Sequence, residues 1–400
     1  MPLDVLPSQK TRFLDLLPRE FDSLVKTWGW PAFRAQQVRQ WAYERLVDSP
    51  EAMSNLSKAD RAALAERVEI TSSRIVSRQI SSDGTIKLLL GWPDGAQAET
   101  VMIPDGDRRT ACVSSQVGCP VQCRFCASGV NGVKGNLSAG QIVEQVYRLN
   151  QTLAEGTKAS GTEARRGGDS AEGEGEFTSS LGPSSHPPCL RAFVPSSSER
   201  ITNVVFMGMG EPLANYASVM QAVRILNDRK CLNMGARRIT ISTVGVPAKM
   251  RQLAEEDLPI NLALSLHAPN EPLRRELIPW AEHFALPDIL DACRYYFDKS
   301  GREITLEYIL LSGVNDRPEH ARELSRLCKT MRANVNLIRY NEVSSLPFKR
   351  PLAKDVVTFQ EILRRNGVNA HVRKSRGGDI DAACGQLRRK EQEKLVQLGS

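Results

Sequence analysis

The sequence predicts an α/β protein whose core is a parallel sheet, preceded by a small helical domain and a short antiparallel meander. Three observations predict this fold class. Helical periodicity with capping signals occupies residues 1–72, strand-length runs separated by Asp-Gly turns occupy 73–111, and strands then alternate with helices as far as residue 373. Repeated strand–helix units imply a parallel sheet, either open or closed into a barrel.

The N-terminal segment, 1–72, is expected to be a helical accessory domain. Pro31 suits the first turn of a helix, and Ser57 suits the N-cap of another. The expected helices are 19–28, 31–46 and 58–68. Aromatic residues between Trp28 and Tyr43 alternate with arginines, which favours a compact helical core. A surface that contacts nucleic acid is the alternative, and the two do not exclude each other.

A β-meander extension is expected over 73–111. Asp-Gly pairs at 83–84, 94–95 and 105–106 are typical of tight turns between strands. The expected strands are 75–80, 86–92 and 99–103, followed by 111–117.

The barrel core is expected over 112–345. Its strands are 111–117, 203–207, 238–242, 261–266, 303–310 and 335–338, and its helices are 139–152, 217–227, 247–255, 287–299 and 318–332. About six such units are fewer than the eight of a complete barrel, so the sequence predicts a partial (β/α)6 TIM-like barrel. A helix at 354–366 and a strand at 369–373 begin a C-terminal segment, 346–400.

Residues 155–200 interrupt this alternation. They are rich in Gly, Ser, Glu and Pro and poor in large apolar residues, so they cannot bury enough surface to offset chain entropy. We expect a disordered insertion in which His186 and Cys189 have no chemical role, because metal sites need ordered ligands.

Composition sets broad limits on location and partners. The net charge of +7, from 53 basic and 46 acidic residues, permits an RNA partner but does not require one. No apolar run approaches the roughly 20 residues of a membrane-spanning helix, and the first residues lack the pattern of a signal peptide. Nine cysteines without regular pairing suit a reducing compartment. We expect a cytoplasmic protein with no membrane partner.

Three cysteines, Cys119, Cys123 and Cys126, follow the strand 111–117 at C-x3-C-x2-C spacing. Three thiolates in one tight loop can bind a soft metal or an iron–sulfur cluster. Structural zinc normally has four protein ligands, and a [4Fe-4S] cluster usually has four cysteines. The triplet therefore leaves one coordination position for a non-protein ligand. A structural zinc or iron site completed by another cysteine is the alternative.

Further candidate residues stand at the carboxyl ends of the predicted strands, where barrel enzymes place their sites. Gly210 and Glu211 follow the second strand: glycine permits close backbone approach, and a carboxylate accepts hydrogen bonds from an ammonium group. The other residues at these ends are Ser242, Ser265, Leu266, His267 and Asn341. Because the strand ends share one rim, they are expected to outline a single pocket.

Four motifs together resemble the RlmN/Cfr family of radical S-adenosylmethionine (SAM) RNA adenine methyltransferases. They are Cys112-Val113-Ser114-Ser115-Gln116-Val117-Gly118-Cys119, Gly208-Met209-Gly210-Glu211-Pro212-Leu213, Ser265-Leu266-His267-Ala268 and the segment from Asp379 to Leu387. They occur in the family's order, and the C-x3-C-x2-C loop matches the radical SAM signature. The resemblance extends from Phe13 to Leu387 apart from the insertion. The C2-methylating RlmN type, which acts on 23S ribosomal RNA and transfer RNA, is the most similar.

The resemblance implies a radical SAM barrel with two cofactors. Cys119, Cys123 and Cys126 would hold a [4Fe-4S] cluster, and SAM would chelate its fourth iron. An electron from the cluster would break the SAM sulfonium to give a 5′-deoxyadenosyl radical, and two SAM molecules would be used per turnover. The residues corresponding to the family's SAM contacts are Gly210, Glu211, Ser242, Ser265, Leu266, His267 and Asn341.

The resemblance also implies three catalytic residues. Cys384 would take a methyl group from SAM and become S-methylcysteine. After losing a hydrogen atom, that methyl group would add to adenine C2, and Glu99 would remove the C2 proton. Cys112 would then attack the Cys384 sulfur, forming a disulfide and releasing the product. Without the resemblance, Cys384 suggests a small buried residue and Glu99 a solvated strand carboxylate.

The expected partners are 23S rRNA and tRNA, together with an electron donor such as flavodoxin or ferredoxin, and the chain is expected to be a monomer. Basic clusters at 373–376 and 388–390 flank Cys384 and would neutralise phosphates. Two alternatives stay open: a Cfr-type enzyme that methylates adenine C8, and a non-catalytic RNA-binding protein with a structural metal. Departures from the family pattern in the insertion, at 339–342 and at 127–132 leave the choice of substrate open.

Overall fold

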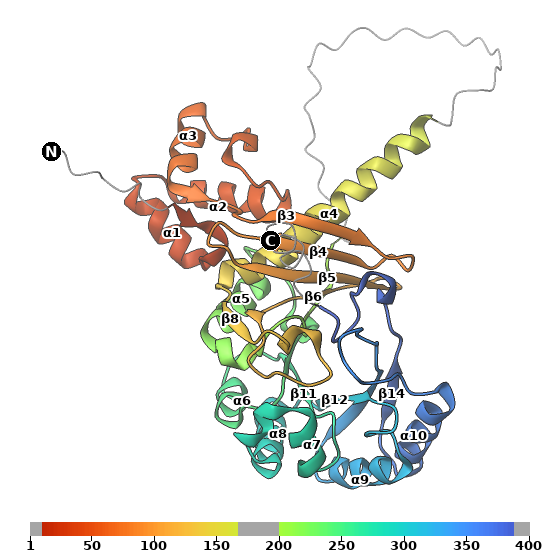
Figure 1. Cartoon of the computed structure of the whole chain (residues 1–400). Coiled ribbons are helices and arrows are strands. Elements are labelled where there is room, and N and C mark those ends of the chain that lie inside the picture. The colour runs from red at the N-terminus through yellow and green to blue at the C-terminus, as the bar shows by residue number, and fades with distance from the viewer. Residues whose placement is uncertain (1–9, 167–199, 388–400) are drawn as a thin grey trace, which may run out of the picture.

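A computed structural model of the chain describes residues 10–166 and 200–387. One ten-stranded sheet passes through the molecule (Figure 1) in the order β14-β13-β12-β11-β10-β9-β6-β5-β4-β3. Its strands are β3 Arg74–Ile80, β4 Ile86–Gly91, β5 Gln97–Asp105, β6 Arg108–Cys112, β9 Asn203–Phe206, β10 Ile239–Thr243, β11 Asn261–Ser265, β12 Ile304–Leu310, β13 Ala333–Arg339 and β14 Ala370–Arg373. Two small sheets pair β1 Thr11–Arg12 with β2 Val68–Glu69, and β7 Gln116–Gly118 with β8 Val133–Asn136.

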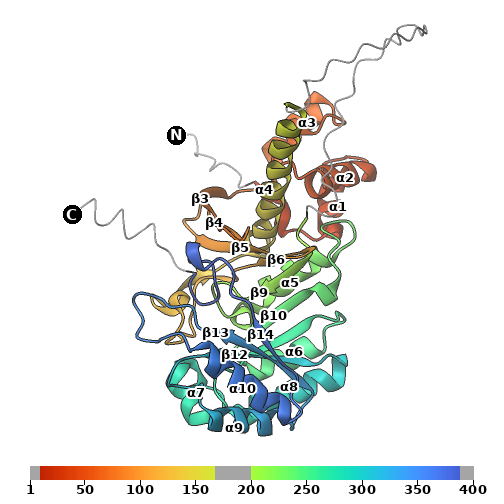
Figure 2. The ribbon, with the colours of Figure 1, turned by 90° about the vertical axis from the view of Figure 1, so that its right-hand side faces the viewer.

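The parallel part of this sheet begins at β6 and continues from β9 to β14. Helices cover the outside of the curved sheet (Figure 2). They are α4 Ala139–Arg166, α5 Tyr216–Asn227, α6 Pro247–Ala254, α8 Leu286–Ser300, α9 Pro318–Cys328 and α10 Ala353–Arg365. Because β14 and β3 are the edges of the sheet, the core is a partial barrel, and the predicted fold class is confirmed.

The predicted meander is an antiparallel extension of the same sheet. β3, β4, β5 and β6 pair in turn, and β6 pairs on its other side with β9. This order places β5, which carries Glu99, directly beside β6, which carries Cys112.

The N-terminal helices are α1 Pro18–Thr27, α2 Ala32–Arg39 and α3 Lys58–Arg67, with a π-helical turn at Gln40–Glu44 that continues α2. As predicted, the Ser57 hydroxyl caps α3, accepting a hydrogen bond from Asp60 N. The rings of Phe13 and Tyr43 pack with centroids 5.4 Å apart, and Trp41 is also buried. Most of the aromatic residues therefore form a helical core, as expected.

The strand predicted over 111–117 is divided in two. β6 ends at Cys112, and the chain then turns inward as Ser114 N donates to the Gln145 side chain and Ser115 N donates to Met209 O. These long-range hydrogen bonds replace the sheet ladder. Also missed was helix α7, Glu271–Leu277, although its N-cap Asn270 is an ordinary start signal.

The prediction that disorder begins at residue 155 is wrong for residues 155–166, because α4 continues to Arg166. The low apolar content of these residues suggested disorder, but it does not prevent the buried helix α4 from continuing through them. At the other end, Arg200 donates hydrogen bonds to the backbone oxygens of Tyr43 and Glu44. His186, Cys189 and the rest of 167–199 lie outside the described residues.

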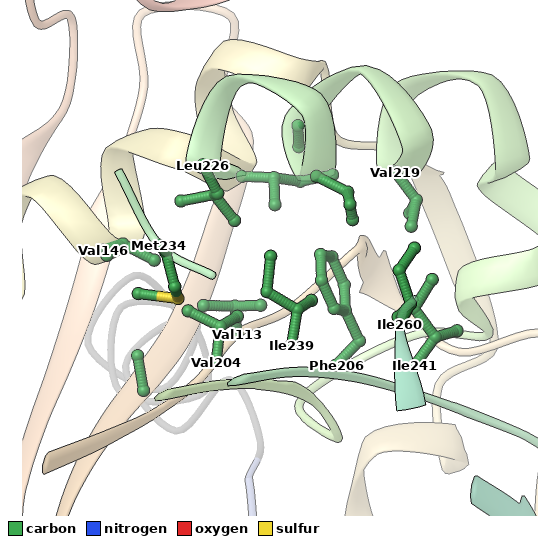
Figure 3. Close-up of a cluster of buried hydrophobic side chains, with 14 of the residues drawn as sticks. Val113, Val146, Val204, Phe206, Val219, Leu226, Met234, Ile239, Ile241 and Ile260 are labelled. Carbon is green, nitrogen blue, oxygen red and sulfur yellow. The ribbon is translucent and has the colours of Figure 1, made fainter. Parts of the chain in front are cut away.

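Alternation along the strands separates the apolar core from the inner face of the barrel. Val204 and Phe206 of β9 and Ile241 of β10 point toward Val219 and Leu226 of α5 (Figure 3). The residues between them face the concave side, where the site lies. Among the helices of the described chain, none has both the length and the apolar character needed to cross a membrane.

Candidate active site

The carboxyl ends of the parallel strands surround a cavity of about 140 Å³. It brings together the loop 119–126, strand-end residues from β9 to β12, and a loop near the C-terminus. The predicted site residues that line it are Cys119, Cys123, Cys126, Gly210, Glu211, Ser242, Ser265, His267 and Cys384. Residues predicted from separate motifs thus share one pocket.

The loop that carries the three cysteines is held by its backbone. Gly118 has a φ of 80°, and a Cβ there would lie 2.0 Å from Gly132 O, so only glycine fits. Cys119 N donates to Gly132 O at 3.0 Å, and Cys126 N donates to Cys123 O at 3.0 Å. These bonds turn the thiols toward the cavity.

The same loop is fastened to the segment that contains Cys384. Ala127 N donates to Gly385 O at 2.8 Å, and the Ser128 hydroxyl donates to Leu387 O at 2.9 Å. These contacts keep Cys384 beside the three-cysteine loop although more than 250 residues separate them in sequence.

The three cysteine side chains suit a cationic iron–sulfur cluster. Burial, with a smaller contribution from Cys126, raises the pKa of Cys119 to about 12. Burial also raises the pKa values of Cys123, helped by its two neighbouring thiols, and of Cys126, helped by Cys384. Buried thiolates this close need positive charge to compensate them, which a cluster provides. Within residues 10–166 and 200–387, no three His, Cys, Asp or Glu side chains are grouped as ligands of one metal ion. The cysteines of an iron–sulfur cluster bind different iron atoms, so their sulfur atoms do not need to point at one common metal position.

Gly210 and Glu211 form the cavity wall next to this loop. Gly210 has a φ of 107°, and a Cβ there would lie 2.7 Å from the Ser115 hydroxyl. The Glu211 carboxylate is buried and accepts hydrogen bonds from Leu213 N at 3.0 Å and Val244 N at 2.9 Å. Burial raises its pKa, and these two donors oppose the rise. The remaining lone pairs of this carboxylate can accept from an ammonium group.

Ser242, Ser265 and His267 form the opposite wall. The two serine hydroxyls are 3.1 Å apart, so they are hydrogen-bonded to each other. His267 Nδ1 accepts from Ile309 N at 3.1 Å, and burial together with the Arg274 charge lowers the His267 pKa to about 3. The imidazole is therefore neutral and has its Nε2 hydrogen available as a donor.

Two predicted SAM contacts lie elsewhere. The Leu266 side chain is buried in the hydrophobic core, so only its backbone is available at this rim. Asn341 lines a smaller cavity, of about 40 Å³, together with Arg373 and Cys384.

Cys112 lies at the end of β6, where it packs with Met209, Ala382 and Leu387. Burial, and then the nearby Cys384, raise its pKa to about 12, although the Arg373 guanidinium opposes the rise. Both Cys112 and Cys384 are free thiols. The structure thus places the two predicted transfer cysteines near each other and near one cation.

Glu99 is buried, so it is not the solvated carboxylate that its residue type suggests. Val101 pairs with Cys112 across β5 and β6, and Glu99, two residues along β5, points to the same side as both. Its Oε1 lies 3.2 Å from Lys87 Nζ. Glu99 is not among the residues that line the 140 Å³ cavity.

Sequence reasoning missed the residues that hold the Cys384 segment. Asp379 accepts hydrogen bonds from the Ser81 hydroxyl at 2.6 Å and from Ser82 N at 3.1 Å. Asp83 accepts from Gly377 N at 3.0 Å. The Asp-Gly turn between β3 and β4, which suggested only a hairpin, therefore holds the loop 377–384. The turn sequence gives no signal of this contact, because the partners are nearly 300 residues apart.

Comparisons with known proteins agree with this geometry. A family model described as the ribosomal RNA large subunit methyltransferase N-terminal domain matches residues 11–70. A protein named "Probable dual-specificity RNA methyltransferase RlmN" from Bacillus thuringiensis subsp. konkukian is 40% identical over 388 residues, which are 97% of this chain and 96% of that protein. The chain belongs to the RlmN family. A protein of the same name from Bacillus cytotoxicus is 39% identical over the same shares of both chains.

The crystal structure of a radical SAM methyltransferase from Sphaerobacter thermophilus has the same fold as this RlmN-family chain. The two superpose with a TM-score of 0.80 at 40% sequence identity, over 94% of this chain and 99% of the other. The expectation of an enzyme with a radical SAM barrel is confirmed, and SAM and a [4Fe-4S] cluster are the cofactors of its family.

The basic cluster 373–376 is only partly exposed. The Arg373 side chain is 32% exposed and lies 3.8 Å from Glu307 Oε2, while a role of the cluster in neutralising phosphates stays a prediction. Lys374 remains exposed, and Arg376 lies 3.8 Å from Asp105. The second cluster, 388–390, lies outside the described residues.

Proposed function

We propose that this chain methylates C2 of an adenine in 23S rRNA, and of an adenine in the tRNA anticodon loop, through a methyl group carried on Cys384. The printed name of its relatives, dual-specificity RNA methyltransferase, supports an RNA substrate. One observation carries the proposal: Cys384 lies beside both the three-cysteine loop and Cys112. Adenine C2 is electron-poor and cannot attack the SAM methyl group directly, so a carrier thiol with a second thiol nearby suits this reaction.

The cavity has side chains of the right kind for both cofactors. Cys119, Cys123 and Cys126 would hold the cluster, which when bound supplies the electron that cleaves SAM. Glu211 would accept from the SAM ammonium, with Gly210 allowing the close approach. Ser242, Ser265 and His267 would complete the SAM site in this cavity. Asn341, from the 40 Å³ cavity that also contains Cys384, and the backbone of Leu266 would add contacts at its edge.

In this proposal Cys384 acts first as a nucleophile. Its thiolate attacks the methyl carbon of one SAM, so that a sulfur–methyl bond forms on Cys384 while the methyl–sulfonium bond breaks and S-adenosylhomocysteine leaves. A second SAM provides the radical that removes a hydrogen atom from this methyl group, so two SAM molecules are used per turnover. The carbon radical adds to adenine C2 and joins the RNA covalently to Cys384.

Glu99 and Cys112 then release the product. Glu99 takes the C2 proton of the adduct radical, from its position on the strand beside Cys112, and the unpaired electron of the adduct would return to the oxidised cluster. The Cys112 thiolate then attacks the Cys384 sulfur, so that a disulfide forms as the carbon–sulfur bond breaks. The electron pair of that bond stays on the methylene carbon, which takes up a proton and becomes the methyl group of the product. An external reductant restores the two thiols. We infer that the chain works as a monomer in the reducing cytoplasm with an electron donor such as flavodoxin or ferredoxin.

Mass analysis of nucleosides tests the proposal. Ribosomal RNA and tRNA lacking the modification are incubated with reconstituted enzyme, SAM and reductant, and then digested. We expect 2-methyladenosine from both RNAs. Finding only 8-methyladenosine would favour the Cfr-type alternative. Finding 2-methyladenosine in only one of the two RNAs would contradict the dual specificity.

A further inference from the structure

A second, larger cavity lies on the concave face of the sheet, with a volume of about 570 Å³. This size is within the range of small-molecule sites. Its interior is polar, with Asn203, Thr240, Thr305, Glu307, Asn336 and Arg373 in its wall. Met207 and Glu307 also line the 140 Å³ cavity that holds the cysteines. The two cavities therefore meet at Glu307.

Glu307 is a buried carboxylate with one oxygen available to a ligand. It lies in β12, only 3% exposed, paired with Ser265 of β11 and Asn336 of β13. Asn336 Nδ2 donates to its Oε1 at 3.1 Å. Its Oε2 accepts no hydrogen bond from any described residue, and the Arg373 guanidinium, 3.8 Å away, is too far to donate one. A buried carboxylate oxygen without a donor is costly, so this position suits a ligand that supplies an N–H group.

Exposed cations on one side of this cavity suit a nucleotide. Arg108 begins β6, Arg238 precedes β10 and Lys374 follows β14; all three line the cavity and are exposed, so we call this side its mouth, and such cations bind phosphates. On the inner side, the Arg373 guanidinium lies near both Glu307 and the transfer cysteines. The negative charge of Cys384, and to a smaller extent those of Glu307 and Cys112, raise the pKa of Arg373. A base in this cavity would thus lie between a cationic entrance and the thiol that carries the methyl group.

We propose that Glu307 reads the amino edge of the target adenine, with Oε2 accepting a hydrogen bond from the exocyclic N6 amine. This inference rests on the proposed function and adds a specificity residue to it. Guanine carries an oxygen at the same ring position, which would face the carboxylate oxygen without a hydrogen between them. Such an unpaired contact in a buried site gives strong discrimination. SAM also carries an adenine, but the larger cavity and its cationic mouth favour the base of the RNA.

The test measures RNA binding in the absence of reductant, so that no radical reaction takes place. Dissociation constants are measured without reductant for an RNA hairpin with adenine at the target position and for the same hairpin with purine, which lacks the amine. We expect the parent enzyme to bind the adenine hairpin about tenfold more tightly than the purine hairpin. Glu307→Ala should reduce this ratio to less than about twofold, mainly by weakening the adenine complex.

Three further arms separate the outcomes. Glu303→Gln, at the exposed residue just before the same strand, should keep the parent ratio. Glu307→Gln keeps the side-chain shape in case Glu307→Ala does not fold. Because Asn336 Nδ2 donates to the Oε1 position, the amide oxygen stays there and the amide NH2 faces the N6 amine, so this variant should reduce the ratio as well. If both Glu307 variants keep the parent ratio of adenine to purine binding, the proposal is overturned. If they keep this ratio but bind SAM more weakly, Glu307 contacts the adenine of SAM instead. If the parent enzyme produces no methyladenosine from either RNA, the proposed function fails, whereas the binding ratio still tests Glu307.

Discussion

Lys87 Nζ lies 3.2 Å from Glu99 Oε1, and both side chains are less than one tenth exposed. The same ammonium donates to Asp381 O at 3.2 Å, three residues before Cys384. One buried cation therefore contacts both the proposed base and the loop that carries the methyl group. A lysine is rarely buried without such a function or partner, because its charge must be compensated.

Replacing Lys87 should slow the release of product. In Lys87→Met the Glu99 carboxylate stays buried without this cation, which favours its protonated form, and a protonated carboxyl cannot accept the C2 proton. We expect methylated product to form at least about tenfold more slowly, while SAM cleavage continues. Liquid chromatography of 5′-deoxyadenosine and 2-methyladenosine measures both rates. Lys87→Arg keeps the charge and should retain much more activity, and equal losses in both variants would contradict this role.

Replacing Cys112 should trap the RNA on the protein. Without the thiol that attacks the Cys384 sulfur, the adduct of Cys112→Ala has no route to a disulfide. We expect a SAM-dependent band of RNA-linked protein on a denaturing gel, and almost no free product. Cys328→Ala, which removes a buried thiol of α9, is the matched control and should turn over normally. Normal turnover in Cys112→Ala would remove this residue from the mechanism.

The sequence predicted most elements and most of the pocket, for physical reasons. Hydrophobic periodicity is local, so most strands and helices of the barrel were found within a few residues, apart from α7 and the end of α4, and strand ends such as Ser242 and Ser265 necessarily share one rim. Lys87 and Glu307 were missed, and Arg373 was predicted only as a phosphate contact, because their importance comes from contacts between different strands and loops. Nothing beside Lys87 in the sequence indicates that it contacts Glu99 and Asp381.

The pH dependence of product release should reflect the Cys112 thiol. In the free enzyme burial, and then the nearby Cys384, raise the pKa of Cys112 to about 12. In the adduct Cys384 is an uncharged thioether, so burial is what keeps the Cys112 pKa raised. At neutral pH only a small fraction of Cys112 is thiolate. As long as the pH is below the pKa, this fraction grows about tenfold with each increase of one pH unit. We expect the single-turnover rate of adduct resolution to rise with pH between about 7 and 9. Arg373→Met removes the opposing cation and should lower this rate at every pH in the range, as rapid-quench measurements would show. A flat profile would mean that another step limits release.

The turn between β3 and β4 should control how well Cys384 is presented to SAM. Asp379 accepts from Ser81 and Ser82, and these contacts fix the loop before Cys384. In Asp379→Ala the loop loses both anchors, and we expect methylation of Cys384 to slow by about tenfold, the cost of one or two hydrogen bonds to a charged group.

Mass spectrometry of the intact reconstituted protein after incubation with SAM measures this step before any RNA is bound. Asp107→Ala, an exposed aspartate in the neighbouring turn between β5 and β6, is the control and should methylate Cys384 at the parent rate. Ser81→Ala removes only one of the two contacts, so its rate of Cys384 methylation should lie between the rates of Asp379→Ala and of the parent. A normal rate in Asp379→Ala would show that the remaining contacts, from Ala127 and Ser128 and from Asp83 and Lys87, position the carrier cysteine without Asp379.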